Sequence, residues 1–215
     1  MTKNIVAVKL KQHGFESQWQ ETVCEMVGRV VSSPLQPGLM GPALSAIEKQ
    51  DRLNELEFYF PLNRLTPDKL KKTFSQCGMS PYPTFPTKIG RLNFQPVRGF
   101  MKGFMDLVFR HDGRFYLIDW KSNFLGPSLD EYKPEALAKI MEEEFYILQY
   151  HLYVLAVDRY LRMRLPEYDY DTHFGGVFYM FLRGVDPSNA ADTGIFRDRP
   201  AKETIDYLGD TLIAS

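Results

Sequence analysis

The sequence predicts an α/β fold in which a mixed central sheet is flanked by helices. Two observations support this class: strand-like segments occur both before and after a long helical segment, and one pair of strands meets at a hairpin turn. The resulting order of helix, strand, hairpin, long helix and strand is typical of layered α/β domains. A chain of 215 residues, 44% hydrophobic and 25% charged, is expected to form one globular domain over residues 1–215.

The first third of the chain predicts two helices separated by a strand. Apolar residues at helical spacing predict a helix over Gly14–Val31, which the following SSPLQPG ends. Leu53–Leu62 is expected to be a strand. Thr66 as N-cap and Pro67 in the first turn predict a short helix ending at Gly78, and the prolines of SPYPTFPTKIGR predict an irregular loop.

The second half predicts a long helix, a buried strand and a terminal helix. Glu135–Leu165 contains strong helix formers without internal Gly or Pro, which predicts one continuous helix. His151 on that helix is expected to be partly exposed. The apolar run Phe174–Gly184 predicts a buried strand, and Lys202–Leu212 predicts a short helix.

The segment between Gly103 and Ser122 predicts a β-hairpin with an acid in each strand. Its turn contains Asp112-Gly113, which supplies the positive φ values that a two-residue type I′ turn requires. Counting outward from this turn places Asp106 opposite Asp119, on one face and in a non-hydrogen-bonded pair.

Two acids in this arrangement repel each other unless a positive group lies between them. A divalent cation would meet this need, and Mg²⁺ is commonly held by one or two carboxylates together with a substrate phosphate. Lys121, two residues after Asp119, is expected on the same face. The alternative is an edge hairpin whose acids are solvated and pair with Lys121.

These residues resemble the D…(D/E)xK signature of the PD-(D/E)xK nuclease superfamily. The string KGFMDLVFRHDGRFYLIDWKSNFLG is similar to the C-terminal nuclease domain of the RecB family, the beta subunit of bacterial RecBCD exonuclease V. LQYHLYVLAVDRYL resembles the QxxxY element of that family, and HFGGVFYMFLRGVD resembles its next strand. The resemblance covers nearly the whole chain and implies a restriction-endonuclease-like fold and an Mg²⁺-dependent deoxyribonuclease.

The resemblance also implies a role for each residue of the candidate site. Asp106 and Asp119 would bind Mg²⁺, and the main-chain carbonyl of Trp120 would complete the coordination. Lys121 would position or deprotonate the attacking water. The remaining implied positions are the upstream acid Glu55, with Glu57 as the alternative, and the DNA-contacting residues Gln149 and Tyr153.

Two departures from the family pattern suggest a fragment of a longer helicase–nuclease chain. The sequence has no GxxxxGK[ST] loop, which the helicase region of the family carries. The metal-binding histidine of the family precedes the Glu-containing strand and would lie upstream of Met1, and His13 is not assigned this role. The expected partners are DNA, RecC-like and RecD-like subunits and the helicase region of the same polypeptide.

Composition limits the other interpretations. A net charge of −1 means that any nucleic-acid contact depends on local charge or on partner chains. Cys24 and Cys77 fit no metal or redox spacing, and no apolar run is long enough to span a membrane, so a cytoplasmic protein is expected. Two alternatives stay open: a catalytically incomplete module that docks DNA or partner chains, and a stand-alone nuclease acting in restriction or RNA processing.

Overall fold

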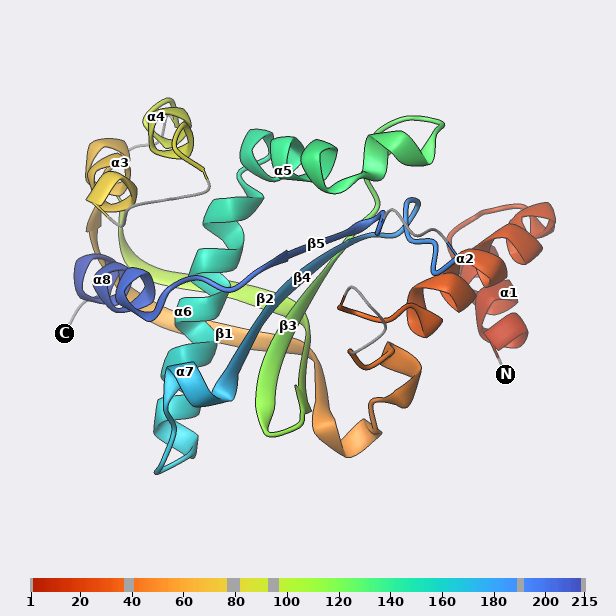
Figure 1. The fold of residues 1–215 in the computed structure, drawn as a ribbon, viewed down its shortest axis with the longest axis horizontal. Helices are drawn as coiled ribbons and strands as arrows, with labels where there is room; N and C mark the ends of the chain where they lie inside the picture. Colours follow the sequence, from red (N-terminus) through yellow and green to blue (C-terminus); the bar gives the residue numbers. More distant parts are fainter. Residues whose placement is uncertain (1, 37–40, 77–81, 93–96, 189–191, 214–215) are drawn as a thin grey trace. The chain divides into compact units, whose positions relative to one another are not determined.

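The strands of the protein form one five-stranded sheet in the order β1-β2-β3-β4-β5 (Figure 1). The computed structural model describes residues 2–36, 41–76, 82–92, 97–188 and 192–213. The strands are β1 (Arg52–Leu65), β2 (Val97–His111), β3 (Arg114–Lys121), β4 (Phe174–Phe181) and β5 (Ile195–Asp198).

The sheet is mixed, as the sequence predicted. Strand β2 pairs in antiparallel fashion with both β1 and β3. Strand β4 runs parallel to β3, because the two strands meet start to start and end to end. Near their starts, a Cβ added to Gly175 would overlap the ring of Tyr116. At their ends, the backbone N–H of Leu182 donates to the carbonyl of Lys121 at 2.9 Å. The turn into β5 reverses the chain, and the backbone N–H of Phe181 donates to the carbonyl of Gly194 at 2.8 Å.

The chain divides into two compact units. One comprises Met1–Glu48, Trp120–Leu137 and Tyr179–Phe196, and the other comprises Lys49–Asp119, Ala138–Phe178 and Arg197–Ser215. Strands β3, β4 and β5 contribute residues to both units. The expectation of a single domain over residues 1–215 stays a prediction.

The second of these units contains β1, β2 and most of the helices. Helix α6 lies across β1 and β2 (Figure 1), and α8 packs against both α6 and β1. Helices α3 and α4 pack together, with Phe74 and Phe85 in edge-to-face contact at 5.5 Å between ring centroids. The helices of this unit are α3 (Pro67–Gln76), α4 (Phe85–Ile89), α6 (Tyr146–Arg164), α7 (Tyr170–His173) and α8 (Lys202–Leu212).

The other unit begins with α1 (Thr2–Gln12) and α2 (Gln20–Ser32), while α5 (Pro134–Glu143) has residues in both units. Short 3₁₀ turns complete the elements, at Ser17–Trp19, Leu44–Ala46, Lys49–Asp51 and Leu129–Tyr132. None of the helices in the described ranges combines the length and the apolar character needed to cross a membrane.

The predicted long helix is wrong, because it is two helices. Phe145 adopts a left-handed backbone conformation, with φ of 56°, between α5 and α6. The centroid of the Phe145 ring lies 6.5 Å from that of the buried ring of Phe85. Packing of the Phe145 side chain therefore overrides the helix propensity of the neighbouring residues.

Other boundaries also differ from the prediction. Helices α3 and α8 and strand β4 form where they were expected, although Gly78 lies outside the described residues. The first predicted helix begins later, at Gln20, after a 3₁₀ turn. The prediction of an irregular loop over SPYPTFPTKIGR is wrong in part, because Phe85–Ile89 forms helix α4 with Pro86 in its first turn. Helix α1 and strand β5 form in segments for which no element was predicted.

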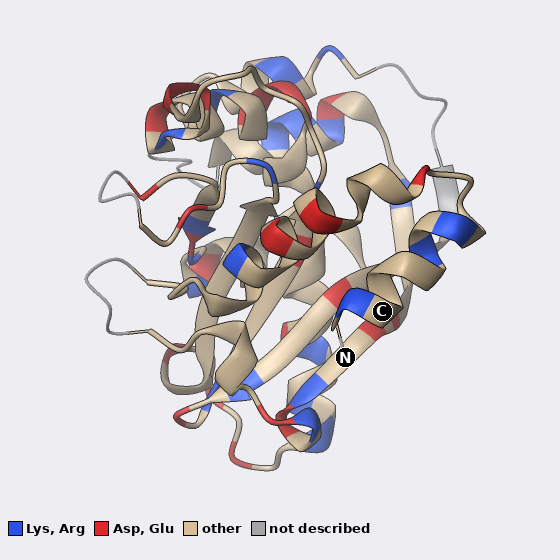
Figure 2. Cartoon of the chain, turned by 90° about the vertical axis from the view of Figure 1, so that its right-hand side faces the viewer, with Lys and Arg blue, Asp and Glu red and all other residues tan. Residues whose placement is uncertain are grey.

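Charged residues of both signs are interspersed along the chain. In Figure 2, Lys and Arg segments alternate with Asp and Glu segments, and neither sign dominates the view. This pattern agrees with the net charge of −1. Recognition of a polyanion therefore depends on particular local groups rather than on a field of one sign over the protein.

Candidate functional site

The hairpin between β2 and β3 has the predicted turn and register. Asp112 and Gly113 both have positive φ, 48° and 76°, as a type I′ turn requires. His111 pairs with Arg114, and the ladder continues without a shift to the pair of Leu107 with Ile118. One further step along this ladder places Asp106 opposite Asp119.

Strand β1 adds a third acid at the same level of the sheet. Asn54 pairs with Leu107 and Leu56 pairs with Met105, so Glu55 stands beside Asp106. Glu55 adopts φ of 51°, a left-handed conformation that is costly for a residue other than Gly and that is concentrated at functional sites. Three carboxylates therefore occupy one row across β1, β2 and β3.

The three acids differ in their exposure to solvent. Asp119 is buried, with 4% of its surface exposed, Asp106 is half-buried and Glu55 is exposed. Within the described ranges, no three His, Cys, Asp or Glu side chains gather closely enough to hold a metal ion. The three acids of this row therefore do not form a cluster of three converging carboxylates.

Glu57, the alternative upstream acid, has a different environment. Its carboxylate lies 2.8 Å from the ammonium group of Lys102, and both side chains are about half exposed. The pairing of Glu57 with Phe104 puts it two residues further along the sheet than the row that contains Asp106. Glu55 is thus the better placed of the two, and its role stays a prediction.

Tyr153 on helix α6 lies within electrostatic reach of the hairpin acids, and Gln149 contacts it from the preceding turn. Burial raises the pKa of Tyr153, and the negative charges of Asp119 and Asp106 raise it further, which places the phenol within electrostatic reach of both acids. A hydrogen bond from Gln149 opposes this shift, because the amide Nε2 donates to the Tyr153 hydroxyl at 2.9 Å. The phenol therefore stays protonated at neutral pH and can donate its own proton.

The ring of Tyr153 rests on strand β1. Its edge meets the ring of Phe58 at 5.6 Å between centroids. Phe58 in turn lies across Gly103 of β2, where an added Cβ would be 2.5 Å from its Cζ atom. Sequence reasoning missed both Phe58 and Gly103. A glycine among bulky residues of a strand is nevertheless a recognised sign that another group packs closely against the backbone there.

Trp120 and Lys121 belong to the other unit and end strand β3. Lys121 is buried, with 8% of its surface exposed, and its ammonium group lies 4.9 Å from the ring centre of Tyr179. Burial of a lysine requires compensating contacts, which this strand end supplies in part through the aromatic ring.

His151 is buried, so the expectation that it would be partly exposed is wrong. Its ring stacks on Tyr150 at 4.5 Å and meets the edge of Phe74 in α3 at 5.4 Å. Desolvation lowers its pKa to about 4, against the opposing effect of a hydrogen bond with the carbonyl of Ile147. The neutral ring is thus a core group that joins α3 to α6.

Asp106 and Asp119 carry the carboxylate oxygens that a hard divalent cation takes as ligands, and they are the next residues along β2 and β3 after the pair of Leu107 with Ile118. Two carboxylates with a substrate phosphate are a common set of ligands for Mg²⁺, which keeps several waters. A buried carboxylate beside a second acid also requires compensation by positive charge.

Comparison with known proteins identifies relatives over most of the chain. RecBCD enzyme subunit RecB of Escherichia coli K12 is 44% identical over 200 residues, which are 92% of this chain and 16% of the relative. RecB of Haemophilus influenzae is 36% identical over 202 residues, with 93% and 16% covered. RecB of Mycobacterium tuberculosis is 33% identical over 199 residues, with 84% and 18% covered.

The chain spans about one-sixth of the length of these relatives. No protein-family model matches the chain, and the PD-(D/E)xK signature stays a prediction. The predicted resemblance to RecB is confirmed. Along the segment that it covers, the chain belongs to the family of RecB subunits of RecBCD enzymes.

Proposed function

We propose that the protein is an Mg²⁺-dependent deoxyribonuclease that hydrolyses phosphodiester bonds. The observation that supports this most directly is the register of the β2–β3 hairpin, whose pairs reach Leu107 and Ile118, so that Asp106 and Asp119 are the next residues along the two strands. Two acids facing each other, one of them buried, cost stability in a hairpin that has only a structural role. The same arrangement is useful for holding a divalent cation against a phosphate.

Each residue has a defined task in this proposal. A bound Mg²⁺ would neutralise the phosphate and lower the pKa of a water molecule. Asp106 and Asp119 would hold the ion together with the main-chain carbonyl of Trp120, and Glu55 would serve as the upstream acid of the site. Lys121 accepts or steers the proton of the attacking water and stabilises the negative charge that develops on the phosphorus oxygens.

Tyr153 and Gln149 act on the substrate. Because Gln149 already donates to the hydroxyl oxygen of Tyr153, the phenol proton is directed elsewhere, and a phosphate oxygen is a suitable acceptor. The raised pKa of Tyr153 keeps this proton in place at neutral pH. The pair would thus position a phosphodiester beside the hairpin acids rather than transfer protons.

The setting of this activity is the processing of DNA breaks. The relatives are subunits of RecBCD enzymes by name, and the chain matches one-sixth of their length. We therefore assign it the nuclease part of an exodeoxyribonuclease V-type complex in recombinational repair. DNA, RecC-like and RecD-like subunits and a helicase region of the same polypeptide would be its partners.

A second candidate is a catalytically incomplete module that docks DNA or partner chains. Two observations favour this alternative: the Glu55 side chain is exposed, and the described residues contain no group of three His, Cys, Asp or Glu side chains that could hold a metal ion. Such a module would keep the fold and the surface contacts without cleaving a phosphodiester bond.

Cleavage of linear single-stranded DNA by the chain with Mg²⁺, compared with its Asp119→Ala variant, tests the proposal. The proposal expects degradation by the wild-type chain and a loss of at least about a hundredfold in the variant. Asp130→Ala, which removes an exposed acid from the turn before α5, is the matched control and should retain activity. Equal rates for wild type and Asp119→Ala would contradict the proposal, and inactivity of both would favour the docking module.

A further inference from the structure

The outer face of the β1–β2 ribbon exposes three large aromatic side chains. Tyr59, Phe100 and Phe104 have 60%, 62% and 51% of their surface exposed. We call these three residues the aromatic shelf. Single exposed apolar residues are common, but a contiguous group on one sheet face usually marks an interaction site.

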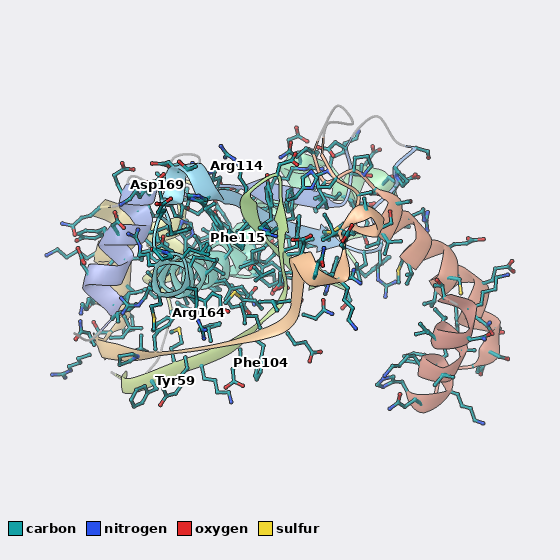
Figure 3. The ribbon with its side chains drawn as sticks, turned by 90° about the horizontal axis from the view of Figure 1, so that it is seen from below. Tyr59, Phe104, Arg114, Phe115, Arg164 and Asp169 are labelled. Atoms are coloured by element: carbon teal, nitrogen blue, oxygen red, sulfur yellow. The ribbon has the colours of Figure 1, made fainter. Side chains whose placement is uncertain are left out.

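The register of the ribbon brings the shelf together. Tyr59 pairs with Lys102 and Glu57 pairs with Phe104, so side chains at these positions share one face, while Phe58 and Phe60 point to the other. Figure 3 shows Tyr59 and Phe104 projecting from the ribbon on the side opposite helix α6. The shelf is therefore separate from the buried contact of Phe58 with Tyr153.

Two rings of the shelf stack on each other, and a lysine lies over the third. Tyr59 and Phe100 stack at 4.6 Å between centroids, with an angle of 10° between their planes. The ammonium group of Lys102 lies 5.4 Å from the ring centre of Phe104 and 2.8 Å from the carboxylate of Glu57. Lys102 thus holds a positive charge at the centre of the shelf. The carboxylate of Glu57, with which it pairs, is about half exposed to solvent.

The position of the shelf along the strands connects it to the hairpin acids. Phe104 precedes Asp106 by two residues, about 7 Å along β2 at the usual rise of a strand. Tyr59 follows Glu55 by four residues, about 13 Å along β1. A chain molecule bound along this ribbon would reach the row of carboxylates within a few repeat units.

The opposite end of the ribbon is basic. Beyond Tyr59, strand β1 carries the exposed Arg64 and continues into α3, which exposes Lys71 and Lys72. From residue 64 to residue 91 the sequence has six Lys and Arg and a single acid, Asp68, although the whole chain has a net charge of −1. Charge in the segment that follows the shelf along β1 is thus predominantly positive.

We propose that the aromatic shelf stacks unpaired bases of a nucleic-acid strand whose phosphates run from the basic end of the ribbon to the hairpin acids. This inference rests on the proposed nuclease function. Bases of any sequence stack on exposed aromatic rings, and a positive groove beside the rings follows the backbone in proteins that bind single strands. Lys102 would exchange the exposed carboxylate of Glu57 for a phosphate.

A protein partner is the other class of occupant for an exposed aromatic face. Interfaces between proteins also gather aromatic residues at their centre. The order of features along β1 favours a nucleic acid. The basic end would bind the phosphates, the aromatic rings would stack on the bases, and the carboxylate row is where the proposed metal-dependent hydrolysis would take place. A protein occupant is therefore treated as an outcome of the test.

The test compares two labelled strands of equal length and charge in a buffer with EDTA, so that binding is measured without cleavage. One strand is an oligothymidine, and the other has the same sugar–phosphate backbone without bases. Fluorescence anisotropy gives Kd for the wild-type chain, for the double variant Phe100→Leu/Phe104→Leu, and for Tyr59→Leu. The matched control is Tyr160→Leu, which removes a half-exposed ring from helix α6.

The wild-type chain should bind the oligothymidine at least about tenfold more tightly than the abasic strand, since stacking is worth about 1–3 kcal/mol per base. The double variant should lose most of this ratio while its affinity for the abasic strand is unchanged. Lys71→Gln/Lys72→Gln should weaken both strands equally and reduce the salt slope by about 1.4. Tyr160→Leu should behave as the wild type.

Two results would overturn the proposal. The first is a wild-type chain that shows no preference for the strand with bases. The second is a ratio of the two affinities that the shelf variants leave unchanged, including the case in which they weaken both strands equally. The second result would leave the shelf as a surface for a protein. A chain that fails to cleave DNA but shows the base-dependent ratio would lose the nuclease assignment and retain the shelf, so the two proposals are tested separately.

Discussion

The side-chain amide of Gln149 donates a hydrogen bond to the hydroxyl oxygen of Tyr153, at 2.9 Å and one helical turn away. This contact holds the Tyr153 hydroxyl against Gln149, and the charges of Asp119 and Asp106 contribute to the raised pKa of the phenol. The two residues therefore act as a unit whose shape is set by the helix before any substrate binds.

Replacement of Tyr153 by Phe should lower kcat/KM for DNA cleavage by about ten- to a hundredfold, because the hydroxyl no longer donates to a charged phosphate oxygen. The ring contact with Phe58 survives the change, so the melting temperature should stay close to that of the wild type. A double-mutant cycle that combines Tyr153→Phe with Gln149→Ala measures the coupling free energy between the two side chains. Fully additive losses would show that the two side chains act independently.

Lys121→Ala should lower cleavage by at least about a hundredfold if the ammonium group stabilises charge in the transition state. The variant also removes a buried contact with Tyr179, so thermal unfolding must accompany the rate measurement. Lys133→Ala, which removes an exposed lysine paired with Asp130, is the matched control and should retain the wild-type rate. A folded Lys121→Ala chain with normal cleavage would remove this residue from the mechanism.

Mg²⁺ should raise the melting temperature of the wild-type chain in a concentration-dependent manner. An ion that binds only the folded state adds about 2.7 kcal/mol at a hundred times its Kd. Asp119→Asn should abolish the shift, whereas Asp130→Asn should retain it. A wild-type chain that shows no shift at tens of millimolar Mg²⁺ would instead support the docking module.

The stability of the fold should fall as the pH is lowered from about 6.5 to about 4. In the folded protein, burial lowers the pKa of His151 to about 4, whereas the unfolded chain protonates near the ordinary value of 6.5. The stabilisation is complete above pH 6.5 and is lost as the pH falls through the folded pKa, by up to about 3 kcal/mol.

Urea unfolding at pH 7 and at pH 4.5 measures this change. His151→Phe keeps a ring between Phe74 and Tyr150 and should show a smaller loss of stability at acid pH than the wild type. The same loss in His151→Phe as in the wild type would assign the acid sensitivity to other groups.

Gly103→Ala should destabilise the protein by about 1–3 kcal/mol, as overpacking of a filled site does. The added methyl group would lie 2.5 Å from Cζ of Phe58, which supports the ring of Tyr153, so cleavage should also fall. Gly28→Ala in helix α2 meets nothing within 4 Å and should stabilise the helix by about 1 kcal/mol. Denaturant unfolding of both variants, with cleavage assays, checks the pair.

Local sequence patterns determined the hairpin and its register. Asp112-Gly113 specifies a type I′ turn by itself, and the count from this turn already places Asp106 opposite Asp119. Helices α3 and α8 likewise follow from local patterns near their ends. These features could be predicted because residues close together in the chain decide them.

Only the tertiary structure decided where the chain breaks its own patterns. The sequence from Glu135 to Leu165 favours one helix, yet packing of Phe145 near Phe85 ends α5 and starts α6. Glu55 acquires its left-handed backbone, and its place beside Asp106, from the pairing of β1 with β2 across about 50 intervening residues. Contacts between distant segments supply the free energy for such conformations, and a local pattern does not encode them.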